Sequence, residues 1–175
     1  MARAYYSTVL DHAAGAVWSV IRSFDHYAWA GVPSETTIED GRQGDQVGSV
    51  RRVVIGTKII RQILLAHSDL ERSYSYSFLS ELPVPARNYL ATIRLTPVTD
   101  GDRAFVEWWA TFDAAPPDER ICIDFFEVRG FAVWLGALRE FMRADRPSDL
   151  PCVALTLQRC EIASNLTPPK VGSPN

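Results

Sequence analysis

An adjacent arginine pair is the first feature of the sequence that could do chemistry. Arg51 and Arg52 lie in a strand-like segment, where successive side chains point to opposite faces, so one of the two is expected to point inward. A buried guanidinium needs an anion or several hydrogen-bond acceptors around it. If Arg51 points inward, a carboxylate, phenolate or enolate of a ligand could be that partner; if it points outward, it is solvated. The sequence leaves both directions open.

Aromatic side chains at alternate positions are the second feature. Tyr74, Tyr76 and Phe78 alternate with serines and so share one strand face, and Trp108 and Phe112 share a face of a later segment. For any one of these rings, packing of a sheet against a helix is the favoured interpretation. The set as a whole also fits the lining of a pocket, in which the polar tips of Tyr and Trp would orient a ligand. The chain holds five Trp, six Tyr and eight Phe, so both uses are open.

A carboxylate on an apolar helix stripe is the third feature. Asp124, Val128, Phe131 and Leu135 follow Pro116-Pro117 at spacings of four, three and four, as one face of a helix requires. A carboxylate above an apolar cavity could act as a general acid or base. However, Asp124 lies near the start of the helix, where an exposed acid is stabilised by the helix dipole, and we favour that interpretation.

The segments that must position these side chains are mostly strands. A strand at 3–10 precedes a helix at 12–24 and a helical turn with Tyr27 and Trp29. The other candidate strands are residues 36–40, 47–55, 59–66, 73–79, 87–97 and 103–113. Turn residues separate them, including Asp100-Gly101, so consecutive strands are expected to be antiparallel. A helix of about 25 residues follows and ends before Pro147.

This order predicts an α+β helix-grip fold, in which a curved antiparallel sheet wraps around the long C-terminal helix and leaves an internal cavity. The predicted domain covers residues 1–146. Residues 147–175 are expected to form a C-terminal extension, with a short strand or turn at 152–158 and disorder from residue 164.

Composition excludes several other classes of protein. The net charge of −3 lacks the basic excess of a nucleic-acid-binding protein. No signal peptide or membrane span is evident, so a cytoplasmic protein is predicted. Cys122, Cys152 and Cys160 have no paired spacing and read as ordinary thiols. The three histidines lack metal-ligand spacing and no nucleotide-binding motif occurs, so we expect neither a metal nor a cofactor. The oligomeric state is left open.

Three groups of residues resemble the START-like superfamily, also called SRPBCC or the birch-pollen-allergen fold. Within it the sequence is most similar to bacterial proteins of the polyketide cyclase/dehydrase type. The matching residues are Val17–Asp25 with Trp29, Gly44–Arg51, and Glu71–Tyr76 followed by Leu82–Pro85, Tyr89 and Val106–Trp108. The likeness covers residues 4–142. One position departs from the pattern: relatives often carry a glutamate in the strand after the arginine, where this chain has Gln62.

The resemblance implies binding of a hydrophobic or aromatic small molecule, lipid-like or polyketide-like, in the cavity. The expected ligand-binding residues are Arg51, Gln62, Tyr74, Tyr76, Phe78, Tyr89, Trp108, Phe112, Val128, Phe131 and Leu135. It also implies an alternative, ranked second, a polyketide cyclase or dehydratase that uses the same cavity. In that enzyme Arg51 would stabilise an enolate oxygen, and Tyr76 or Tyr89 would donate or relay a proton. A module that binds a protein partner through an aromatic patch is the least favoured interpretation.

Overall fold

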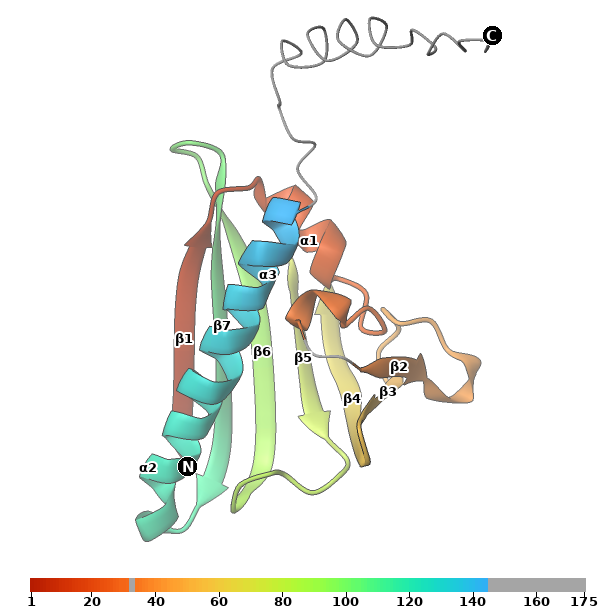
Figure 1. Cartoon of the computed structure of the whole chain (residues 1–175), viewed down its shortest axis with the longest axis vertical. Helices are drawn as coiled ribbons and strands as arrows, with labels where there is room; N and C mark the ends of the chain where they lie inside the picture. The colour runs from red at the N-terminus through yellow and green to blue at the C-terminus, as the bar shows by residue number, and fades with distance from the viewer. Residues whose placement is uncertain (32–33, 145–175) are drawn as a thin grey trace, which may run out of the picture. The chain divides into compact units, whose positions relative to one another are not determined.

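The structure, a computed structural model, describes residues 1–31 and 34–144. Its strands are β1 (Ala2–Leu10), β2 (Glu35–Ile38), β3 (Val50–Ile55), β4 (Lys58–Ser68), β5 (Ser73–Phe78), β6 (Ala86–Val98) and β7 (Arg103–Ala114). They form one antiparallel sheet in the order β1-β7-β6-β5-β4-β3-β2 (Figure 1). The predicted meander is therefore confirmed, and β1 forms one edge of the sheet by pairing with β7.

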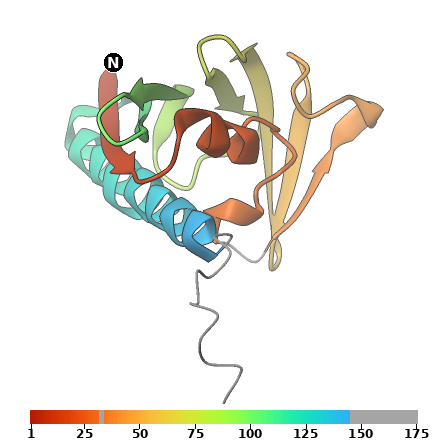
Figure 2. The ribbon, with the colours of Figure 1, turned by 90° about the horizontal axis from the view of Figure 1, so that it is seen from above.

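Helices cover one face of this sheet. Helix α1 (Ala14–Ile21) and a short 3-10 helix (Ala28–Ala30) follow β1, and the C-terminal helix begins as α2 (Pro116–Asp124) and ends as α3 (Ala132–Ala144). Figure 2 shows the strands arranged in an arc, with the C-terminal helix across the open side of the arc. This confirms the α+β helix-grip arrangement that the sequence predicts.

The strand register decides which polar side chains meet on the inner face. Arg51 of β3 pairs with Gln62 of β4, and Gln62 in turn pairs with Phe78 of β5. Directly opposed residues of antiparallel strands lie about 4.5–5.5 Å apart at Cβ. Arg51, Gln62 and Phe78 therefore form a row across the sheet, perpendicular to the strands.

The C-terminal helix departs from the predicted regular periodicity. Between α2 and α3, residues Phe125–Phe131 form a π-helical segment, in which hydrogen bonds span five residues instead of four. The buried positions here are Cys122, Phe126, Gly130 and Phe131, and those with a side chain, Cys122, Phe126 and Phe131, lie at spacings of four and five. The wider turn rotates Val128 outward, where it is 61% exposed. The prediction that Val128 faces the cavity was wrong for this reason.

The predictions for the C-terminal extension are not tested by the structure. The extension at 147–175, including the strand or turn at 152–158, lies outside the described residues. Within the described residues, no helix combines the length and apolar character that crossing a membrane requires.

Candidate functional site

A largely apolar pocket of about 610 Å³ lies where the start of β4, the β5–β6 connection and the C-terminal helix come together. This volume is within the range of small-molecule sites in proteins. Its aromatic lining comprises Phe78, Tyr89, Phe125, Phe126 and Trp134, and its other lining residues are Lys58, Ile59, Ile60, Ser80, Glu81, Leu82 and Pro83. The polar members are few, so the pocket suits an apolar molecule with a small number of polar atoms.

The π-helical segment supplies part of this lining. It carries Phe125 and Phe126 side by side, and the ring centroids of the pair are 5.5 Å apart. Phe126 also contacts the Tyr89 ring at 4.8 Å, which joins the helix to β6. The pocket therefore sits where the helix is not a regular α-helix, a placement that is frequent for functional sites.

Apart from Arg51, Gln62 and the exposed Val128, the residues predicted to bind a ligand fall into two groups. Phe78 and Tyr89 line the pocket. A second group belongs to the buried core and does not line the pocket: Tyr74, Tyr76, Trp108, Phe112, Phe131 and Leu135. In this group Trp108 stacks on Phe131 with centroids 5.0 Å apart. Both uses of aromatic residues that the sequence left open are thus present, at different depths.

Several residues that line the pocket were not predicted from the sequence. Phe125, Phe126 and Trp134 were not selected, because a regular helical period centred on Val128 and Phe131 points elsewhere. Ile60 was also missed, although it lies two residues before Gln62 and so shares its strand face. The aromatic run Phe125-Phe126 was the signal that could have found the first two.

Arg51 points inward and is only 2% exposed. Its Nε and Nη2 donate to Gln62 Oε1 at 3.0 and 2.5 Å, and its Nη1 donates to the Phe24 carbonyl at 3.1 Å. The guanidinium carbon also lies 4.1 Å from the ring centroid of Phe24 and 4.6 Å from that of Tyr27. Among the described residues no carboxylate forms an ion pair with Arg51. The buried charge is held by neutral acceptors and aromatic faces.

The interior tyrosines are neutral phenols at physiological pH. Burial raises the pKa of Tyr27 to about 12. Burial also raises the pKa of Tyr74, Tyr76 and Tyr89, and the positive charge of Arg51 opposes this for Tyr74 and Tyr76. Tyr76 lies between Arg51 and the pocket: its ring centroid is 5.8 Å from the guanidinium carbon and 6.3 Å from the centroid of Tyr89. These hydroxyls can donate hydrogen bonds to a ligand without ionising.

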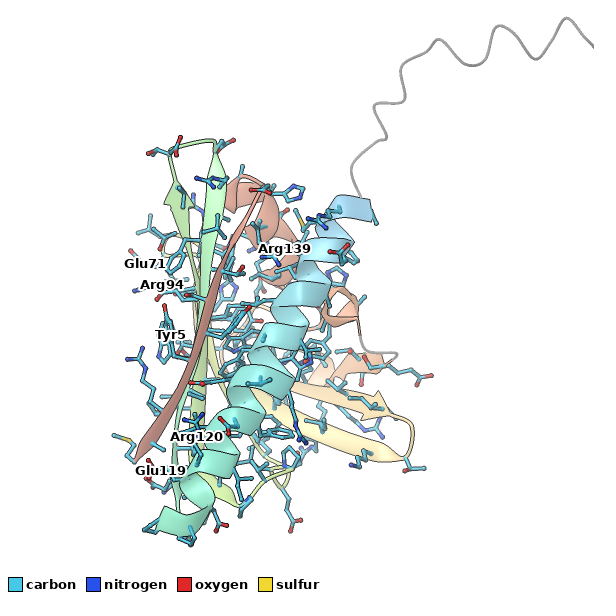
Figure 3. All side chains as sticks on the ribbon, turned by 60° about the vertical axis from the view of Figure 1, so that its left-hand side comes forward. Tyr5, Glu71, Arg94, Glu119, Arg120 and Arg139 are labelled. Carbon is cyan, nitrogen blue, oxygen red and sulfur yellow. The ribbon has the colours of Figure 1, made fainter. Side chains whose placement is uncertain are left out.

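The candidate carboxylate Asp124 is half-exposed and does not line this pocket. Asp124 pairs with Arg120 at 2.9 Å, but it is the last residue of α2, so the expectation that it meets the helix dipole near the helix start was wrong. Glu107 pairs with Arg94 at 2.5 Å, and Figure 3 shows Arg94 and Tyr5 on the side of the sheet away from the helix. No cluster of possible metal ligands occurs among residues 1–31 and 34–144.

Comparison with known proteins agrees with this geometry. A family model described as polyketide cyclase / dehydrase and lipid transport matches residues 1–144. The chain is 27% identical to the protein XoxI of Bacillus cereus, with a TM-score of 0.69 over 81% of this chain and 95% of that one. It is 26% identical to a Thermobifida fusca protein, with a TM-score of 0.71 over 83% and 96% of the two chains.

A plant enzyme shares the fold. Norcoclaurine synthase from Thalictrum flavum, solved in complex with dopamine and hydroxybenzaldehyde, is 12% identical, with a TM-score of 0.64 over 82% of this chain and 87% of that one. At this identity the likeness concerns the fold alone. No curated protein matches the sequence.

Proposed function

Because the chain belongs to the polyketide cyclase/dehydrase and lipid transport family, we propose that it binds a hydrophobic, partly aromatic small molecule in the pocket lined by Phe78 and Tyr89. The family implies either binding of a hydrophobic ligand or cyclase activity. The pocket itself is the observation that carries the first of these, since rings from three separate elements surround one apolar space.

The polar end of the site would be the row that leads from Phe78 through Gln62 to Arg51. Phe78 lines the pocket, and the two polar side chains lie behind it on the same sheet face. A positive charge without a carboxylate partner attracts an anionic or electron-rich oxygen. We therefore propose that Arg51 favours ligands that carry such an oxygen, while the rings bind the apolar body.

Native mass spectrometry of freshly purified protein tests the binding function, because a retained ligand adds its mass to that of the chain. A variant that fills the pocket, Ile60→Trp, should lose the added mass, since Ile60 lines the pocket. The matched control is Ile63→Trp, which places the same ring on the other face of β4 and should retain it. Equal ligand retention by both variants would exclude this pocket as the site.

A cyclase or dehydratase is the second candidate function, and the pairing of Arg51 with neutral tyrosines favours it. Tyr89 borders the pocket and contacts Tyr76, which contacts the guanidinium. In that enzyme the tyrosines would donate protons or hydrogen bonds to a carbonyl oxygen, and Arg51 would stabilise the resulting enolate. Glu81 is the carboxylate among the described lining residues that could act as a base.

The variant Tyr89→Phe separates the two functions, because it removes one hydroxyl and retains the ring. For a binding protein, affinity should change by less than about tenfold, which is the range of one hydrogen bond. For an enzyme, turnover of a polyketide-like substrate should fall by about 10²–10⁴-fold with little change in binding. Absence of turnover in the wild-type protein over a panel of such substrates would favour binding alone.

A further inference from the structure

Two indole N–H groups in the interior have no hydrogen-bond partner. The Nε1 atoms of Trp29 and Trp108 are both fully buried and unpaired in the described structure. The two rings are neighbours, with centroids 6.1 Å apart. Indole nitrogen is a donor only, so neither group can be satisfied by another donor. Unpaired buried donors are rare in proteins, and each one calls for an explanation.

The described interior offers these two indole groups no carboxylate acceptor. The buried polar residues among the described ones are Ser49, Arg51 and Gln62, with no buried carboxylate. The side-chain oxygen of Gln62 already accepts two bonds from Arg51. The buried tyrosine hydroxyls could accept a hydrogen bond, but none of them pairs with the Nε1–H of Trp29 or Trp108 in the described structure.

A path of ring contacts links the unpaired donors to the pocket. Trp134 lines the pocket, and its ring centroid is 5.4 Å from that of Trp108. Trp29 and Trp108 do not line the pocket, so a ligand oxygen would reach their indole groups only if the Trp134 ring, which is partly exposed on α3, moved aside. Gly130, one turn earlier, lies against the same ring and leaves it room on that side.

From these observations we propose that the ligand carries a hydrogen-bond-accepting oxygen without a donor, as in an aryl ketone, and that Trp29 and Trp108 bind this oxygen through their Nε1–H groups. This rests on the proposed binding function and names the class of ligand for the same site. A carbonyl oxygen has two lone pairs, which matches two donors. Ligands whose polar group can only donate, such as an ammonium, would leave both indole N–H groups unpaired and should bind weakly.

A pair of matched probes tests this: 2-acetylnaphthalene, and 2-isopropenylnaphthalene, which has nearly the same shape but no oxygen. In the wild-type protein the ketone should bind about tenfold more tightly, as expected for one to two neutral hydrogen bonds. This preference should fall below about twofold in Trp29→Phe/Trp108→Phe. It should persist in Trp109→Phe, since Trp109 lies on the other face of β7 beside Arg94.

Indole ¹⁵N–¹H spectra of the wild-type protein supply a measurement that does not depend on how well the double variant folds. The Nε1–H signals of Trp29 and Trp108, assigned from single Trp→Phe variants, should move downfield with the ketone and not with the hydrocarbon. Equal affinities for the two probes, or indole signals that respond alike to both, would overturn the acceptor subsite and leave the binding function standing. Failure of both probes to bind would count against the proposed function itself.

Discussion

Replacing Gln62 by leucine tests how the interior accommodates the charge of Arg51. The guanidinium donates two hydrogen bonds to Gln62 Oε1, at 3.0 and 2.5 Å, and both would be lost. A hydrogen bond that involves a charged group contributes about 1.5–3 kcal/mol. Since the Phe24 carbonyl and the aromatic faces remain, we expect Gln62→Leu to lower the free energy of unfolding by about 3 kcal/mol, at the lower end of the sum.

Replacing the charged residue Arg51 should lower the free energy of unfolding by less than replacing its acceptor Gln62. Replacing both residues together should lower it least of all. Arg51→Met removes the charge but leaves the Gln62 amide unpaired, with an expected loss of about 2 kcal/mol. In Arg51→Met/Gln62→Leu both partners are replaced by apolar side chains of similar size, a change that is often close to neutral. We expect the double variant to lose about 1–2 kcal/mol, against about 5 kcal/mol for the sum of the single variants.

Urea unfolding at pH 7, followed by tryptophan fluorescence and circular dichroism, gives these energies directly. The control is Arg52→Met, which changes the neighbouring arginine on the other face of β3 and should shift stability by less than about 0.5 kcal/mol. The reasoning is refuted if Gln62→Leu costs less than about 1 kcal/mol, or if the double variant loses as much as the two single variants together.

Three further predictions concern the acid end of the stability profile, the alkaline end, and the helix. The hydrogen bond from Arg22 lowers the pKa of Asp69, so Asp69→Asn should reduce the melting temperature at pH 7. The difference in melting temperature between variant and wild type should vanish as the pH falls well below 4, because the wild-type carboxyl is then protonated. Burial raises the pKa of Tyr27 to about 12, so the contribution of this residue to stability is complete below pH 10 and declines as the pH rises towards 12. When tyrosinate absorbance is followed against pH, Tyr27→Phe should show one group fewer than the wild type among those that ionise above pH 10. Phe126→Ala should cost about 3–5 kcal/mol and Val128→Ala less than about 0.5 kcal/mol in urea unfolding, and the opposite order would contradict the π-helical register.

The fold could be predicted because its signals are local. Strand segments such as 103–113 alternate in character, turn residues such as Asp100-Gly101 separate them, and short connections allow only antiparallel pairing. The observed β7, Arg103–Ala114, extends the predicted segment by one residue. Strand parity likewise identified the inward face of β5, where Tyr74 and Tyr76 are both buried.

The site could be predicted only in part because its location depends on tertiary packing. Strand parity predicted that one of Arg51 and Arg52 faces inward. Which of the two does so depends on the register between β3 and β4, which pairs Arg51 with Gln62, and residue spacing within one strand does not determine that register. Which of the inward rings border open space also depends on how sheet and helix fit together. Tyr76 and Tyr89 lie on the same sheet face, yet only Tyr89 lines the pocket.

The helix shows most directly how one local irregularity can create a site. In a regular α-helix each residue turns by about 100°, so side chains five positions apart point roughly 140° away from each other. Phe126 and Phe131 could not then both face the sheet, yet both are buried against it. The wider π-helical turn resolves this conflict and carries Phe125 to the pocket wall. A chain without the extra residue would keep the sheet and the helix contact but present a different set of rings to the ligand, so the length of this segment should control specificity within the fold.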